Sequence, residues 1–167
     1  KGVNVVTGTE VTREMIEKEA PDYVVLAVGG QRPELELASN GRTEVISLDD
    51  IAAAKVGDHV TILGSNAQAV DTAQYLFAQG RHVTMVSPEG KEKLDKGQSS
   101  WVKQFTIPML YANGMRLWPN ASIKEVRDGE IVIDGETGCD IVIPCETVID
   151  ARDMLPNTEL IDGLSIP

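Results

Sequence analysis

The sequence lacks a long apolar segment, a signal peptide and an excess of positive charge. No apolar run approaches ~18 residues, the length that a membrane-spanning helix needs. The first residues show neither the basic nor the apolar region of a signal peptide. The 167 residues carry a formal net charge of −11, which repels phosphates. We therefore expect neither nucleic acid nor a membrane as a partner.

Cysteine is nearly absent, and the two that occur do not form a familiar motif. Cys139 and Cys145 are not spaced as C-x-x-C, and no histidine lies near enough in the sequence to suggest a zinc site. We interpret them as buried or half-buried thiols in a reducing compartment. The sequence thus predicts a cytoplasmic protein with no metal site.

The chain has no Met at its start, and residues 3–6 already have the pattern of a strand. It ends with residues 165–167, just after a predicted turn. We interpret it as a piece of a longer polypeptide, long enough for one domain or for one domain with part of another.

The order of the predicted elements indicates an α/β fold. Helices are expected over residues 13–19, 48–54 and 99–112, with Pro108 kinking or shortening the last of these. A further helix is expected in the run that residues 64–69 open and that ends near residue 79, and residues 34–44 are interpreted as a linker. Strands are expected over residues 3–6, 23–28, 59–63, 82–86, 115–118, 122–126, 130–134, 140–143 and 146–151. Strands alternating with helices, then a hairpin pattern around Gly129, predict a Rossmann-like doubly wound parallel sheet with a small antiparallel β-meander.

Residues 64–69 resemble a degenerate dinucleotide-binding fingerprint, G-x-G-x-x-G/A, between a strand and a helix. Gly64 permits the tight turn, and Ala69 lets the helix pack closely on the strand. Asn66 replaces the second glycine, at the point where the backbone should approach a pyrophosphate. Its side-chain amide could clash with the pyrophosphate or donate a hydrogen bond to it. The predicted cofactor-binding residues of the turn are Gly64, Ser65, Asn66, Ala67, Gln68 and Ala69.

The acidic residue that binds the ribose in such proteins has no counterpart here. Ser87 stands at that position, at the end of the second strand of the unit. Its hydroxyl could bind a ribose or a 2′-phosphate, the latter with help from Lys91 and Lys93. The alternative is that Ser87 only caps a turn before Pro88.

A wider resemblance strengthens the nucleotide reading. Residues 63–76, LGSNAQAVDTAQYL, resemble the I-G-G-G-x-x-G-x-E-T-A-E-Y-L segment of flavin-dependent oxidoreductases. The resemblance is to the multidomain family of 2,4-dienoyl-CoA reductase and 2-enoate reductase, old-yellow-enzyme-type NADH:flavin oxidoreductases related to trimethylamine dehydrogenase. Residues 8–12, 21–29, 56–60 and 155–160 resemble further segments of this family in the same order.

In this family an old-yellow-enzyme barrel precedes domains that bind FAD and NAD(P)H. The resemblance implies that residues 45–151 form the NAD(P)H-binding domain. Residues 1–44 would be a remnant of the FAD domain with a linker, and residues 152–167 a return segment toward it. FAD would be bound mainly by parts of the parent chain that are absent here, and that parent could also hold FMN and an iron–sulfur cluster.

The resemblance also assigns further cofactor-binding residues. Gly29 matches the flavin loop, while Ala151 and Arg152 match a second A-x-G loop. Asp71 stands where the family has Glu, near the expected nicotinamide face, and Asp153 stands where the family often has Gly.

Two functions follow as hypotheses. In the first, the domain binds NAD(P)H and passes hydride to FAD, for reduction of an unsaturated enoate- or enoyl-type substrate elsewhere in the parent chain. Its partners would be the nucleotide and other domains of that chain. No catalytic side chain is needed in this piece, which would be inactive alone, and His59 and His82 are read as structural. In the alternative, Asn66 and Asp153 crowd the pocket, and the module is structural or binds only ADP, as in trimethylamine-dehydrogenase-like proteins.

Overall fold

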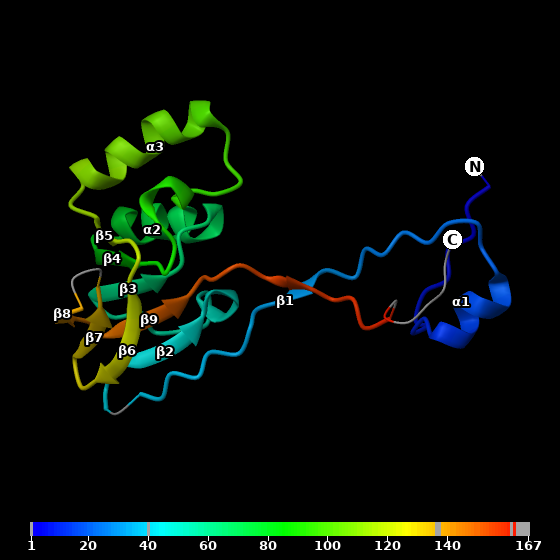
Figure 1. Cartoon of the computed structure of the whole chain (residues 1–167), viewed down its shortest axis with the longest axis horizontal. Coiled ribbons are helices and arrows are strands. Elements are labelled where there is room, and N and C mark those ends of the chain that lie inside the picture. The colour runs from blue at the N-terminus through cyan, green and yellow to red at the C-terminus, as the bar shows by residue number, and fades with distance from the viewer. Residues whose placement is uncertain (1, 40, 136–137, 161, 163–167) are drawn as a thin grey trace. The chain divides into compact units, whose positions relative to one another are not determined.

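The computed structural model describes residues 2–39, 41–135, 138–160 and 162. The chain forms two compact units (Figure 1): residues 33–153 make up the larger one, and residues 1–32 with 154–167 the smaller one.

A five-stranded parallel sheet forms the centre of the larger unit. Its strands run in the order β2-β9-β3-β4-β5, with every neighbouring pair parallel. Their bounds are β2 Glu44–Ser47, β9 Thr147–Asp150, β3 His59–Leu63, β4 His82–Val86 and β5 Arg116–Trp118. The predicted Rossmann-like α/β fold is confirmed.

Different elements cover the two faces of this sheet. Helices α2 (Ala67–Ala78) and α3 (Ser100–Ala112) contribute to the core on one face. On the other face packs the predicted meander, β6 (Ser122–Arg127), β7 (Glu130–Asp134) and β8 (Asp140–Pro144), which is antiparallel. Because successive strand side chains alternate, Ile62 joins the helical core and Leu63 the meander core.

Helix α2 carries a stripe of buried small and aliphatic residues. Ala69, Val70, Ala73 and Leu76 are all fully buried, at the spacing of one helical face. Gly80 follows the helix with φ +80°, a backbone conformation that glycine adopts without strain. Truncation of Leu76 to Ala would cost about 2–5 kcal/mol, the usual range for a buried Leu.

Of two local predictions in this unit, one is confirmed in part and one was wrong. The helix expected over residues 99–112 is present as α3, and it runs through Pro108 without being shortened. The proline and Gln104, whose carbonyl loses its bond, are both exposed, so water can satisfy that carbonyl. The helix expected over residues 48–54 is only the 3₁₀ turn Leu48–Asp50, preceded by the unpredicted strand β2. The four residues of β2, at the edge of the sheet, are too few to show the alternation of apolar and polar residues that predicts a strand.

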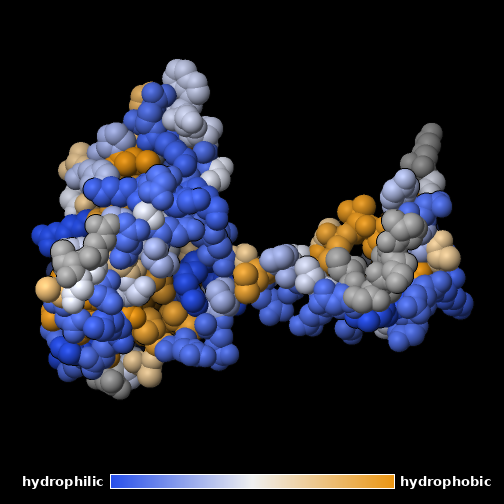
Figure 2. All heavy atoms as spheres, viewed as in Figure 1, coloured by the Kyte–Doolittle hydropathy of each residue, from blue (hydrophilic) through white to orange (hydrophobic). Residues whose placement is uncertain are grey.

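The described residues of the smaller unit form one helix and one short ladder. Helix α1 (Arg13–Glu19) was predicted, with Thr12 as its N-cap, and β1 (Gly30–Gln31) pairs antiparallel with β10 (Leu155–Pro156). The strands expected over residues 3–6 and 23–28 were wrong. Within the described residues of this unit no segment pairs with them, and Val25 is 89% exposed. Figure 2 shows hydrophobic surface on this unit.

The prediction that both cysteines are buried or half-buried is confirmed for one of them and wrong for the other. Cys145 is buried, and burial raises the pKa of its thiol, whereas Cys139 is exposed, contrary to expectation, because it lies just before an edge strand. Across the described residues, no helix combines the length and apolarity needed to cross a membrane. Residues 161 and 163–167 of the predicted return segment lie outside the described residues.

Candidate functional site

The candidate site lies where the parallel strands β3, β4 and β9 end. In open α/β sheets ligands bind beside the carboxyl ends of the strands, because the loops there leave a crevice. A pocket of about 240 Å³ occupies this edge. The residues that matter most in its wall are Gly64, Ser65, Asn66, Ser87, Arg152 and Asp153.

Gly64 brings the end of β3 against the end of β9. Its φ is +132°, and a Cβ built on it would lie 2.7 Å from the Ala151 carbonyl oxygen. Two backbone hydrogen bonds join the neighbouring strand ends here: the Gly64 N–H donates to the Val86 carbonyl at 2.9 Å, and the Ala151 N–H donates to the Leu63 carbonyl at 2.9 Å. No other residue fits this turn without moving a strand.

Asn66 is the N-cap of α2 and a bridge to the opposite loop. Its Oδ1 accepts a hydrogen bond from the Ala69 N–H at 2.9 Å. Its Nδ2 donates to the Ala151 carbonyl at 2.9 Å and to the Asp153 carboxylate at 2.8 Å. The amide is therefore engaged as a donor within the chain, and the choice between a clash with a pyrophosphate and a hydrogen bond to it stays open.

Lys96 completes this arrangement, which we call the Asn66–Asp153–Lys96 bridge. Its ammonium group lies 3.0 Å from the Asp153 carboxylate, and this hydrogen bond, with the charge of Asp153, raises the pKa of Lys96. The carbonyl of Lys96 accepts from the Ala67 N–H at 3.2 Å. The amides of Ala67 and Ala69, at the start of α2, thus have acceptors within the protein, and a carboxylate lies beside the positive end of the helix.

Two serine hydroxyls meet at the floor of the pocket. Ser87 Oγ donates to Ser65 Oγ at 3.0 Å, and both residues are buried. Ser87 Oγ also accepts from the Glu89 N–H at 3.1 Å. Ser87 therefore caps the turn before Pro88, as the structural alternative predicted, and its hydroxyl lines the pocket as well.

Arg152 is held by a buried carboxylate. Its guanidinium forms two hydrogen bonds of 2.9 Å with Asp150, which raise the pKa of the arginine, and it also donates to the carbonyls of Pro33 and Glu34. Asp150 is 4% exposed. This pairing fixes the loop after β9, so that Asp153 faces Asn66.

Asp95 lies behind the turn and was missed by the sequence argument. Its backbone N–H donates to the Ser65 carbonyl at 2.6 Å, and its φ is +60°. Both carboxylate oxygens are buried without a hydrogen-bond partner in the described part of the chain, and burial raises the pKa of this group.

The structure brings together most of the predicted site residues. Gly64, Ser65, Asn66, Ser87, Ala151 and Arg152 meet at the pocket, and Ala67 and Ala69 form the adjoining start of α2. Gln68 and Asp71 are exposed on α2 and do not line the pocket. Gly29 belongs to the smaller unit, where its carbonyl accepts from the Asn157 N–H.

Sequence reasoning did not find Lys96. It lies in the irregular segment between β4 and α3, and only the nearby Lys91 and Lys93 had been considered. Among the residues that the structure describes, no three His, Cys, Asp or Glu side chains gather in a group that could hold a metal ion.

Comparison with known proteins identifies related chains. The sequence profile described as "Pyridine nucleotide-disulphide oxidoreductase" matches residues 1–167. An "NADH oxidase" of Thermoanaerobacter brockii is 34% identical over 91 residues, 51% of this chain and 14% of that protein. A "Probable N-methylproline demethylase" of Rhizobium meliloti (strain 1021) is 36% identical over 93 residues, 53% of this chain and 13% of that protein.

Solved structures extend the similarity over nearly the whole chain. A 2-naphthoyl-CoA reductase in complex with 2-naphthoyl-CoA aligns with a TM-score of 0.69 and 26% identity, over 92% of this chain and 23% of that one. Histamine dehydrogenase from Rhizobium sp. 4-9 aligns with a TM-score of 0.68 over 92% of this chain and 26% of that one; at 16% identity it shows the fold alone. This chain spans about one seventh of the curated relatives' length.

Proposed function

This chain belongs to the pyridine nucleotide-disulphide oxidoreductase family, and we propose that it is the NAD(P)H-binding domain of a multidomain flavin-dependent oxidoreductase. The observation that carries this proposal is the pocket at the carboxyl ends of β3, β4 and β9, closed behind by Gly64 and opening onto the start of α2. Nucleotides bind at this place in Rossmann-like sheets. The similarity to an NADH oxidase supports the nicotinamide dinucleotide as the ligand.

The residues present fit a nucleotide at the ribose side of the pocket. The Ser87 hydroxyl, at the end of β4, stands where a ribose or 2′-phosphate would lie, and the backbone of Gly64, Ser65 and Asn66 leads to the helix start that would hold the pyrophosphate. On the pyrophosphate side lies the Asp153 carboxylate. Binding therefore requires Asp153 to leave Asn66 and Lys96, which frees an amide and an ammonium group for the phosphates.

NAD(P)H, when bound, would supply hydride for a flavin held mainly by other parts of the parent chain. This chain needs no acid, base or nucleophile for that transfer, because its residues bind and orient the nucleotide. The similarity to 2-naphthoyl-CoA reductase supports reduction of an unsaturated, enoyl-type substrate elsewhere in the parent chain as the overall reaction. The partners of this domain are then the nucleotide and the remaining domains.

Calorimetric titration of the full chain with NADH and with NADPH, each to millimolar concentration, tests the proposal. We expect saturable heat with at least one of them. If a sample with a cooperative unfolding transition gives no heat with either, and Asn66→Gly and Asp153→Gly variants give none as well, the proposal is wrong.

The bridge itself favours a second candidate function. The bridge satisfies the hydrogen-bonding groups of Asn66, Asp153 and Lys96 within the chain, and it fills the phosphate side of the pocket. These features are expected of a domain that serves as a structural module or binds only ADP. Titration with ADP separates the two: saturation by ADP but not by either dinucleotide identifies the second function.

A further inference from the structure

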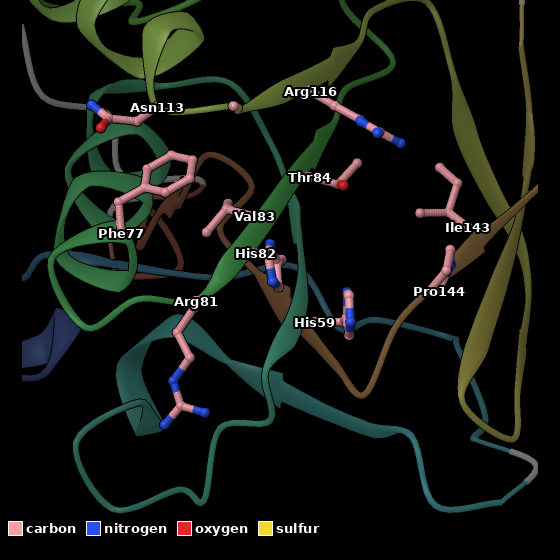
Figure 3. A pocket seen from close by; sticks show the side chains of 11 residues that line it. His59, Phe77, Arg81, His82, Val83, Thr84, Asn113, Arg116, Ile143 and Pro144 are labelled. Carbon is pink, nitrogen blue, oxygen red and sulfur yellow. The ribbon is translucent and has the colours of Figure 1, made fainter.

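The larger unit has another pocket, of about 360 Å³, at the amino-terminal end of β3 and β4 (Figure 3). His59 and His82 are the first residues of these strands and line it. Because β3 runs five residues from His59 to Leu63, about 13 Å of strand separate this pocket from the turn at Gly64. The pocket is therefore distinct from the candidate nucleotide site.

The parallel register brings polar side chains together at this end. His59 pairs with His82, and Thr84 pairs with Arg116 of β5. His82 and Thr84 are two residues apart on one strand and hence share a face. The two imidazoles stack with centroids 4.9 Å apart and an angle of 17° between their planes. Figure 3 shows them beside Thr84, while Arg116 extends toward Ile143.

The charge of this pocket is opposite to that of the chain. The chain has 26 Asp and Glu against 15 Lys and Arg, yet the pocket is lined by two arginines and both histidines, and no acidic residue is in its wall. Each of these side chains is a hydrogen-bond donor when protonated.

Several of these donors have no acceptor. Over the described ranges of the chain, Arg116 forms no hydrogen bond or ion pair, and neither imidazole forms one. Arg81 binds Asp58 through Nη1 at 2.8 Å and points away from the histidines, but its Nε is buried without a partner. Arg116 and both histidines are exposed, so water solvates these donors when the pocket is empty, and a group with several acceptor atoms could replace that water.

Besides Asp58, which pairs with Arg81, the acidic residue Glu146 adjoins the start of β3, and its carboxylate is already engaged. The Glu146 carboxylate accepts from the backbone N–H groups of Asp58 at 2.6 Å and of His59 at 3.0 Å. These bonds lower the pKa of Glu146, and the charges of His59 and Arg81 contribute. Glu146 lies before β9 and is not in the pocket wall, where Arg116 carries a positive charge.

We propose that this pocket binds a phosphate-type dianion between Arg116 and the His59–His82 pair. The guanidinium fork and the imidazole N–H groups match the tetrahedral oxygens of a phosphate, and hydrogen bonds between charged groups are the strong ones. The volume leaves room for a small organic group against Ile143 and Pro144, so the phosphate is either the free ion or a small monoester.

The chain offers a direct probe, because His59 and His82 are its only histidines. Inorganic phosphate and glycerol 3-phosphate are titrated separately, at fixed pH and ionic strength, against sodium chloride, and the two imidazole C–H resonances are followed by NMR. We expect both to shift with one saturable curve. Saturation by both compounds identifies the phosphate group as the feature bound, and saturation by inorganic phosphate alone limits the ligand to the free ion.

Substitutions in the pocket test whether the phosphate binds to the proposed residues. Arg116→Gln is expected to weaken binding at least tenfold, whereas Arg42→Gln, which removes the same charge from the exposed Arg42–Asp128 pair, is expected to leave it unchanged. His82→Asn, read through the remaining His59 resonance, should weaken it as well. A linear shift equal to that with chloride means an adventitious ion only; that outcome, or unaltered affinity in Arg116→Gln, overturns the proposal.

Discussion

The side-chain amide of Asn66 donates a hydrogen bond of 2.8 Å to the carboxylate of Asp153, across the mouth of the nucleotide crevice. The dinucleotide-binding fingerprint has glycine at the position of Asn66, and the family that the sequence resembles often has glycine at the position of Asp153, which would leave the space between them open. Here two side chains, neutralised in part by Lys96, fill it. If the crevice binds a nucleotide as proposed, we expect its affinity to depend on the cost of separating these groups.

The first prediction concerns Asn66→Gly. The variant loses the cap and two donated hydrogen bonds, so the free energy of unfolding should fall by about 1–3 kcal/mol, measured by urea denaturation. NADH affinity should rise at least about tenfold, which corresponds to about 1.4 kcal/mol, because Asp153 loses its hydrogen bond to Asn66 and can move away from the crevice at a lower cost. Asn113→Gly is the matched control: it removes a side-chain amide bonded to the Met109 carbonyl, far along the chain from the crevice, and should leave the affinity unchanged.

The second prediction concerns Gly64→Ala. The added Cβ would meet the Ala151 carbonyl oxygen at 2.7 Å, at a φ of +132°, so we expect a loss of at least about 2 kcal/mol in unfolding free energy. Gly80→Ala has a positive φ but no atom within 4 Å and should cost only about 1 kcal/mol. Equal losses in the two variants would show that the approach of β3 to β9 is not tight.

The third prediction concerns the serine pair. Ser87→Ala leaves the buried Ser65 hydroxyl and the Glu89 N–H without their partner, which should cost about 1–3 kcal/mol. The double variant Ser65→Ala/Ser87→Ala should cost less than the sum of the single variants, because it removes both ends of one bond. Strict additivity in thermal or urea unfolding would contradict the Oγ–Oγ bond.

The fourth prediction is a pH dependence at Asp95. Burial raises the pKa of this carboxyl in the folded chain, with Asp71 adding to the rise and Lys103 opposing it. The folded state then holds the proton more tightly than the unfolded state, so stability falls as the pH rises from about 4, the ordinary Asp value, through the folded pKa.

Asp95→Asn should consequently stabilise the chain by about 1–3 kcal/mol at pH 7 and by less at pH 4. Asn also tolerates the positive φ at this position. Urea denaturation of both proteins at the two pH values checks this, and a gain that is no smaller at pH 4 would rule out titration of Asp95 as the cause.

The sequence predicted the core of the fold because its signals there were local. The apolar runs ending at Leu63 and Val86, and the helix between them, have clear periods and clear ends, and the structure confirms them. The strand expected over residues 23–28 failed for the opposite reason. An apolar segment forms a strand only if a neighbouring strand pairs with it, and the sequence of the segment alone does not show whether such a partner exists.

The residues of the candidate site were likewise predicted where the signal was local and missed where it was not. Gly64, Asn66 and Ser87 were found because their spacing from a strand end is fixed. Lys96 was not found, because its approach to Asp153 depends on an irregular segment with positive φ at Asp95 and Gly97. The Ser65–Ser87 bond likewise needs the parallel register of β3 and β4, which places their ends side by side.

Amide NMR of the ¹⁵N-labelled chain during titration with NADH tests the central claim most directly. The account predicts saturable shifts concentrated at residues 64–69, 87–89 and 151–153, with the Asn66 side-chain amide among the largest, since it exchanges Asp153 for the nucleotide. Shifts confined to other residues, or none at saturating NADH in a folded sample of both the natural chain and Asn66→Gly, would contradict it.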